Sequence, residues 1–114
     1  MKTLVIHLFH ADEHALGTGS HVSERIRQVI AQHDVALEVY VFGPAEQALA
    51  DPAHARYRET LVDLARAGVP VHVCRNDAER MGMADEFARV GFTLEYARDA
   101  FIRYAQDGAT VITF

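Results

Sequence analysis

The sequence has 114 residues, half of them hydrophobic, and a formal net charge of −5 at pH 7. This length predicts one domain, residues 1–114, that can bury a core without disulfides or metals. The eleven basic residues are spread singly along the chain. We therefore expect no nucleic-acid partner and no membrane anchor of clustered basic residues, because both need concentrated positive charge. No apolar stretch approaches the length of a membrane span.

Cysteine usage predicts the cellular compartment. Cys74 is the only cysteine in the chain, so no disulfide can form within it. A lone cysteine favours a reducing compartment. The apolar stretch that begins at Met1 is short and is interrupted by His7 and His10, unlike a secretory signal peptide. We therefore expect a cytoplasmic protein.

The first part of the chain predicts two strands with a helix between them. Residues 3–9 are a nearly continuous apolar run, which is typical of a strand covered on both faces. A polar loop is expected over residues 10–20. Apolar residues then recur at helical spacing over 22–30, with Ser20 as the expected N-cap. Residues 36–42 predict the second strand.

The rest of the chain continues this alternation with shorter elements. The helix near the C-terminus is expected to turn Ala100, Phe101, Tyr104 and Ala105 toward the core. The expected elements, in chain order, are a short helix within 43–51, a helix carrying Tyr57, Leu61 and Leu64 and closed by Gly68, a strand at 69–74, a short helix at 76–82, a strand at 92–96, a helix at 98–106 and a strand at 110–114.

Strands that alternate with helices predict an α/β fold with a parallel sheet covered on both faces. In such sheets, sites form outside the carboxyl ends of the strands. We therefore expect the functional residues in the loops that follow Phe9, Phe42, Cys74 and Tyr96.

Cys74 is the leading candidate for chemistry. Strand alternation places it on the same face as His72, at the end of the third strand. The residues that follow predict a helix start with Asn76 or Asp77 as its cap. A thiol just before a helix, beside the charge of Arg75, is expected to ionise more readily to the reactive thiolate. The alternative is a buried structural cysteine, since free cysteines are among the most buried residues.

Histidines before the first predicted helix invite a metal-binding interpretation. His10, His14 and His21 could converge only if the loop folded back on itself, and no established metal-ligand spacing supports this. We therefore expect no metal, although a metal-binding loop remains a third hypothesis. A milder role is that His10 or Asp12, at the exit of the first strand, faces the cysteine and tunes its charge.

Glycines at two places could approach a ligand. Residues 17–20 resemble an anion cradle before a helix, but Val22 replaces the third glycine of the dinucleotide motif and no Walker lysine is present. A flexible loop with a cap is the preferred interpretation, and we expect no cofactor. Gly43 and Pro44 form a turn at a strand exit, which places them beside the expected site.

Three segments together resemble the DsrE/DsrF-like family, which includes TusD-like sulfur-relay proteins. They are Leu4–Leu8, Val41–Pro44, and Leu64–Cys74 continuing to Met81–Met83. The resemblance spans essentially the whole chain. It implies a three-layer α/β/α sandwich with a five-stranded, mainly parallel sheet. The long histidine-rich segment 7–21 departs from the family pattern.

The resemblance also implies a function. In sulfur-relay members, the cysteine that matches Cys74 accepts a persulfide sulfur and passes it on, so sulfur donor and acceptor proteins are the expected partners. Arg75 and the backbone N–H groups of Asn76 and Asp77 would then stabilise the sulfur anion. The chain has no second cysteine, which suits a relay to another protein.

Family members assemble as trimers or hexamers, so a homo-oligomer is expected. The predicted helix faces could supply apolar contact area through Phe87, Phe92, Phe101 and Tyr104. The leading hypothesis is therefore a sulfur carrier or sulfurtransferase that works through a Cys74 persulfide. The alternative is a non-catalytic oligomeric module of the same fold that binds a small molecule or a protein without transferring sulfur.

Overall fold

The computed structural model describes every residue from Met1 to Phe114 and contains one five-stranded sheet. The strand order is β4-β3-β2-β1-β5, and every neighbouring pair is parallel. This arrangement confirms the predicted α/β fold. The strands are β1 (Lys2–Leu8), β2 (Val35–Val41), β3 (Val71–Val73), β4 (Thr93–Leu94) and β5 (Thr110–Thr113).

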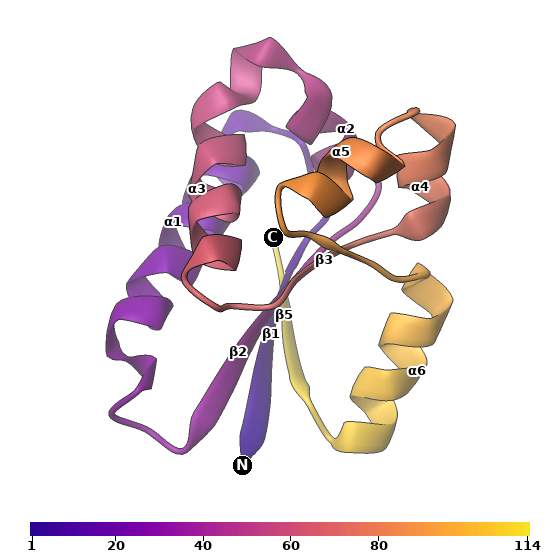
Figure 1. Cartoon of the computed structure of the whole chain (residues 1–114). Coiled ribbons are helices and arrows are strands. Elements are labelled where there is room, and N and C mark those ends of the chain that lie inside the picture. Colours follow the sequence, from indigo (N-terminus) through magenta and orange to yellow (C-terminus); the bar gives the residue numbers. More distant parts are fainter.

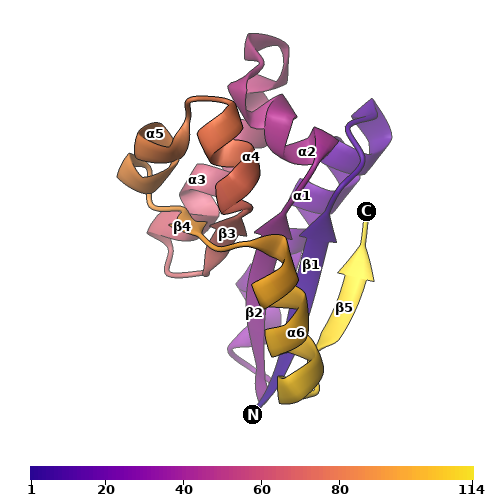
Figure 2. The same cartoon turned by 90° about the vertical axis from the view of Figure 1, so that its right-hand side faces the viewer.

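Helices cover both faces of the sheet, as predicted. Helix α6 lies on one face, and α1 and α3 lie on the other (Figures 1 and 2). None of the helices combines the length and the apolar character needed to cross a membrane. The helices are α1 (Glu13–Ile30), α2 (Pro44–Gln47), α3 (Ala55–Arg66), α4 (Arg75–Arg80), α5 (Ala84–Arg89) and α6 (Ala97–Asp107), with short 3₁₀ turns η1 (Ala48–Ala50) and η2 (Pro52–His54).

Strand alternation divides the buried side chains into two cores. Ile6, Val39 and Val71 belong to the larger core, which is filled by α1, α3 and α5. Their neighbours on the opposite face, Val5 and Tyr40 among them, belong to a smaller core beneath α6. The smaller core also contains Cys74, Ala100 and Tyr104. The cysteine therefore lies on the face of the sheet that only α6 covers.

The predicted loop at residues 10–20 is wrong, because most of it is helix. Helix α1 begins at Glu13, and Asp12 caps it by accepting a hydrogen bond from the Ala15 N–H at 2.9 Å. Ser20 is not a cap but lies inside the helix, where its hydroxyl donates to the Leu16 carbonyl at 2.7 Å. The flexible loop with a cap that was expected at 17–20 is therefore wrong, and the rejected alternative, an anion cradle before a helix, is ruled out as well.

Gly19 explains why the helix begins earlier than the sequence pattern predicts. Glycine disfavours helix, so the two glycines of α1 indicate a loop when only their neighbours in sequence are considered. A Cβ on Gly19 would lie 2.4 Å from Leu8 Cδ2 and 3.1 Å from Phe114 Cβ. The glycine is therefore a packing requirement that lets α1 approach the sheet closely. A Cβ on Gly17 would meet no atom within 4 Å, so that position carries no such constraint.

The prediction for the inner side of α6 is half correct. Ala100 and Tyr104 are buried, but Phe101 and Ala105 are exposed. The aromatic residues expected to supply oligomer contacts are also mostly unsuitable. Phe87, Phe92 and Tyr104 are buried in the protomer, and Phe101 alone retains substantial exposure at 38%.

Candidate functional site

The candidate site lies where β2 and β3 end side by side. The Cys74 N–H donates to the Val41 carbonyl at 3.2 Å, which joins the residue that follows β3 to the last residue of β2. The chain leaves β2 at Gly43 and enters α2, and it leaves β3 at Cys74 and enters α4. Cys74 thus lies at the carboxyl edge of the sheet, where the sequence predicts the site.

Cys74 is buried, with 3% of its surface exposed. The structure makes Cys74 itself the N-cap of α4, so the prediction of a cap at Asn76 or Asp77 is wrong. The cause is an earlier helix start, because Arg75 already has helical geometry and the Ala78 N–H bonds to the Cys74 carbonyl at 3.0 Å. The thiol therefore lies directly at the junction of strand and helix.

Glu46 is the residue of this site that sequence reasoning missed. It comes from α2, is fully buried, and its Oε1 accepts a hydrogen bond from the Cys74 N–H at 3.0 Å. Its other oxygen, Oε2, is buried without any hydrogen-bond partner. Burial, together with the negative charge of Asp77, raises the pKa of Glu46 to about 8, although the bond from Cys74 acts in the opposite direction.

Asp77 on α4 connects the segments that follow β2 and β3. Its Oδ2 accepts a hydrogen bond from the Gly43 N–H at 3.0 Å. Gly43 has a φ of 63°, and a Cβ there would lie 2.6 Å from Phe9 Cε1, so both its conformation and its surroundings require glycine. One side-chain oxygen from each acid and the Cys74 sulfur lie within 4.8 Å of one another. The thiol thus faces two carboxyl groups.

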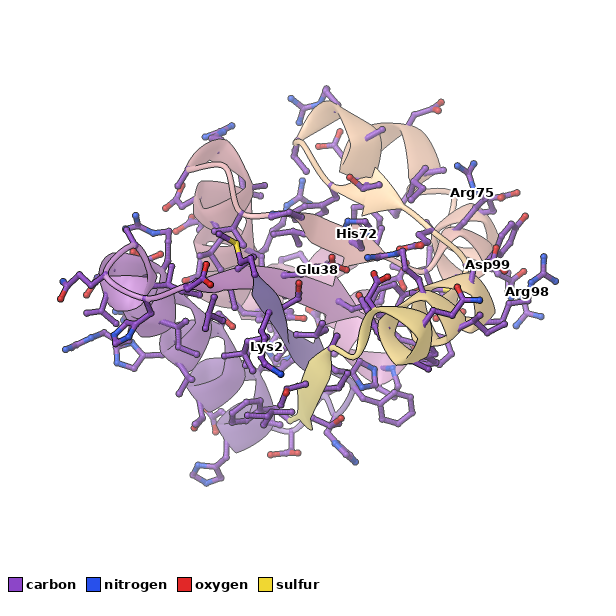
Figure 3. All side chains as sticks on the ribbon, turned by 90° about the horizontal axis from the view of Figure 1, so that it is seen from below. Lys2, Glu38, His72, Arg75, Arg98 and Asp99 are labelled. Atoms are coloured by element: carbon purple, nitrogen blue, oxygen red, sulfur yellow. The ribbon has the colours of Figure 1, made fainter.

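The other predicted site residues lie apart from this group. The Arg75 guanidinium lies 3.5 Å from the Leu94 carbonyl and 6.0 Å from the centre of the Tyr96 ring, at the outer rim in Figure 3. Asn76 and Pro44 are exposed, with Pro44 in the first turn of α2. His10 is exposed and packs edge-on against Phe9.

The metal-loop hypothesis does not agree with the structure. His14 and His21 are exposed residues of α1, and the loop that would bring them to His10 does not exist. The side chains of metal-ligating type that do converge are Glu46, Cys74 and Asp77, and separately Glu38, His72 and Glu95. In both groups each carboxyl group accepts at least one hydrogen bond from a protein N–H group, and among the Glu46 oxygens only Oε1 does so.

A second polar cluster, which we call the Arg103 cluster, lies between the sheet and α6. It consists of Glu38, His72, Glu95, Arg103 and Tyr104. Arg103 donates to Glu38 at 2.8 and 3.2 Å and to Glu95 at 2.8 and 3.1 Å. His72 Nδ1 lies 2.8 Å from Glu95 Oε1, and the Tyr104 hydroxyl donates to Glu38. Figure 3 shows Glu38 and His72 between the strands and α6.

The electrostatics of the Arg103 cluster follow from these bonds. Hydrogen bonds from Arg103 hold the pKa of Glu95 below its usual range, with His72 adding to the effect. Burial, followed by the bond to Glu38, raises the pKa of Tyr104. Sequence could have indicated this cluster, because Glu38 interrupts an apolar strand and a buried acid requires a partner.

Tyr40 connects the Arg103 cluster with the cysteine. It packs in the same small core as Cys74, and its hydroxyl donates to the Glu95 carbonyl at 2.8 Å. Burial raises the pKa of Tyr40 above its usual range, and the neighbouring Cys74 and Glu46 raise it further. Tyr40 therefore remains a neutral hydrogen-bonding group beside the thiol.

A hollow of about 500 Å³ opens elsewhere, between α1 and the segment from η2 into α3. Its lining is mostly polar and includes His21, His54 and Tyr57, but neither Cys74 nor Glu46. The candidate site at Cys74 therefore does not coincide with this hollow. Cys74 is instead a covered thiol that acids and apolar groups surround.

The fold and this site define a parallel α/β protein with a buried cysteine at a strand exit. A profile of the DsrE/DsrF-like family matches residues 17–114, so the chain belongs to the DsrE/DsrF-like family. This match confirms the resemblance drawn from the sequence. A search of curated proteins found no match.

Solved structures share the fold across their full length. A conserved protein of unknown function, BT1422 from Bacteroides thetaiotaomicron, has a TM-score of 0.80 at 12% identity, covering 99% of this chain and 95% of its own. The protein of unknown function MTH1491 from Methanobacterium thermoautotrophicum has a TM-score of 0.70 at 19% identity, with complete coverage of both chains. The ychN protein from E. coli has a TM-score of 0.67 at 16% identity, also with complete coverage. At these identities the likeness shows the fold alone.

Proposed function

We propose that the protein is a DsrE-like sulfur carrier that relays a persulfide sulfur on Cys74. The observation that carries this proposal is the placement of the only thiol at the exit of β3, within 4.8 Å of two acids, in a chain of this family. A thiol enclosed by hydrogen-bonding groups and apolar surface suits a persulfide, which must be protected from water and stray thiols while it is held.

The transfer balances without an oxidant. The Cys74 thiolate attacks the outer sulfur of a donor persulfide and forms a new S–S bond, while the S–S bond of the donor breaks. The electron pair leaves with the donor thiolate, which takes up the proton that the Cys74 thiol lost. An acceptor thiolate then attacks the outer sulfur and regenerates Cys74. We assign the N–H groups of Asn76 and Asp77, in the first turn of α4, as further donors to the sulfur anion.

The same proposal includes a homo-oligomer, a trimer or hexamer, in the cytoplasm, where reducing conditions keep a thiol free. Exposed apolar side chains on α6 and β5 support the assembly. Ile102 is 57% exposed, and Val111 and Ile112 are exposed on β5, which is an open edge of the sheet.

Sulfur loading tests the proposal directly. The protein is incubated with a small-molecule persulfide donor, freed of it, and analysed as an intact chain by mass spectrometry. One added sulfur is expected on wild type, and it should pass to an added acceptor thiol. The Cys74→Ala variant controls for nonspecific sulfur. Equal loading of the variant, or no loading of wild type, overturns the proposal.

A non-catalytic binding module remains the second candidate, because an exposure of 3% suits the holding of a persulfide but leaves the Cys74 sulfur little surface for a sulfur donor to reach. In that case Cys74 only lines the core beneath α6. The alkylation rate at neutral pH separates the two functions. A rate no faster than that of a cysteine in a short peptide supports the binding module, whereas a faster rate supports the sulfur carrier.

A further inference from the structure

Glu46 is placed where a charged carboxylate is costly. It is fully buried, and one of its oxygens has no hydrogen-bond partner. An ionised carboxylate in such a position loses most of its hydration without replacement. The neutral acid avoids this cost, and its proton needs an acceptor. The nearest group of the proposed chemistry is the Cys74 sulfur, within 4.8 Å of a Glu46 oxygen.

We propose that Glu46 stays neutral in the resting site and donates a hydrogen bond to the sulfur of Cys74 when the thiolate or the persulfide anion forms. This inference rests on the proposed function and assigns a residue to stabilise its sulfur anion. The Cys74 N–H fixes Oε1 at 3.0 Å, which leaves Oε2 for the donated proton. The thiolate and the persulfide anion then form beside a neutral donor and not beside a second negative charge.

The surroundings of the pair explain why an acid is used. The titratable groups that face it are Asp77 from α4, Tyr57 from α3 and Tyr40 from β2, with Glu95 beyond Tyr40. Burial keeps both tyrosines neutral, and Asp77 is held by the Gly43 N–H. Because these side chains supply no positive charge, a neutral side-chain donor adds to the backbone N–H groups of α4 in favouring a sulfur anion.

Glu46 keeps its proton throughout the transfer, because the proton lost by the Cys74 thiol goes to the departing donor thiolate. As pH rises past about 8, Glu46 ionises, since that is where burial places its pKa. The donor is then lost and a carboxylate faces the sulfur, so the sulfur anion is less favoured there. The pH profile of Cys74 alkylation should therefore show the ionisation of Glu46 as a separate step.

The test is the pH profile of Cys74 alkylation by a neutral reagent, from about pH 6 to about pH 10. Glu46→Gln keeps the acceptor for the Cys74 N–H and replaces the acid with an amide donor that does not titrate. Wild type should give a two-step profile and the variant a single step. At about pH 9 the variant should react about five to ten times faster, while the two rates agree near pH 6.

Asp77→Asn is the matched comparison, because it removes a charge and keeps an acceptor for the Gly43 N–H. The inference predicts that this variant retains two steps, with the first moved to lower pH, since Asp77 raises the pKa of Glu46. A Glu46→Gln profile that superimposes on wild type overturns the inference. So does an Asp77→Asn variant that loses the second step as Glu46→Gln does.

A measurement on the wild-type protein does not depend on whether a variant folds. Carbon NMR of the Glu46 carboxyl should show a neutral acid at neutral pH and titration near pH 8. Titration near the ordinary value of about 4.3 overturns the inference. The two proposals can fail separately. If wild type forms no persulfide but its alkylation profile has two steps, only the sulfur-transfer proposal fails. If wild type takes up sulfur but its alkylation profile has a single step, only the role of Glu46 is overturned.

Discussion

Arg103 on α6 and Glu38 on β2, 65 residues apart in sequence, form a two-point ion pair with N–O distances of 2.8 and 3.2 Å. The same guanidinium holds Glu95, which follows β4. One side chain therefore fastens α6 to the sheet directly over the core that contains Cys74. We therefore expect access to the thiol to depend on how firmly this helix is held.

Replacing this arginine should expose the cysteine. Arg103→Met keeps an unbranched apolar side chain, removes the guanidinium that lies over the Tyr104 ring, and leaves Glu38 and Glu95 without their shared cation. We expect the free energy of unfolding to fall by about 2 kcal/mol, because the buried Glu38 and the partly buried Glu95 lose their partner. Cys74 alkylation at neutral pH should become several times faster as α6 opens more often, by roughly threefold or more.

Arg98→Met is the matched control on the same helix. Arg98 is exposed, pairs with its neighbour Asp99, and lies over the Tyr96 ring at 5.0 Å from its centre. These contacts are exposed, so its replacement should change stability by less than about 0.5 kcal/mol. Alkylation of Arg103→Met at the wild-type rate would show that α6 does not limit access to Cys74.

Glu46 should make the free energy of unfolding decrease as pH rises. Its pKa is raised to about 8 in the folded state, against about 4.3 in an unfolded chain. The folded state therefore binds the proton more tightly than the unfolded chain. The resulting contribution to the free energy of unfolding is complete below about pH 4.3 and is lost as pH rises to about 8. Glu46→Gln has no such group, so its stability relative to wild type should increase over that interval, by at most about 1.4 kcal/mol per pH unit.

Urea unfolding between about pH 5 and about pH 8.5 measures this difference. Glu59→Gln serves as the control, because Glu59 is an exposed acid of α3. Its curve should run parallel to that of wild type. If the Glu46→Gln curve also runs parallel, the acid is ionised in the folded protein throughout this range.

Two glycines of α1 should respond to alanine in opposite directions. At Gly17, which has open space around it, alanine should stabilise the protein by about 0.5 to 1 kcal/mol through its higher helix propensity. At Gly19 the new methyl group would collide with Leu8 and Phe114, so we expect a loss of about 1 to 3 kcal/mol. Urea unfolding of both variants checks this, and equal stabilisation would mean that α1 does not pack this closely on β1.

The same glycines show what sequence can and cannot predict. Apolar runs identify all five strands, and strand alternation places Cys74 and His72 on one face, because these signals are local. Whether Gly19 marks a loop or a close packing contact depends on Leu8 and Phe114, which are distant in sequence. Glu46 escapes prediction for the same reason. Its neighbours do not distinguish it from a solvent-facing acid, and only the return of the chain at Cys74 buries it.

Assembly through α6 and β5 is the last prediction. Ile102 is the most exposed large apolar residue of α6, and Phe101 beside it is 38% exposed. Ile102→Glu places a charge in this proposed contact, and in an acidic chain each copy would repel the next. We expect sedimentation to show an oligomer for wild type and a shift to monomer for the variant, by roughly tenfold or more in dissociation constant.

Gln106→Glu adds the same charge to an exposed polar position of α6 and should leave the oligomer intact if the contact is centred on Ile102. A wild-type protein that sediments as a monomer contradicts the assembly outright. If both variants dissociate the oligomer equally, added negative charge is responsible and Ile102 is not at the contact. If neither does, the copies meet through another face, and the exposed residues of α6 and β5 serve a different purpose.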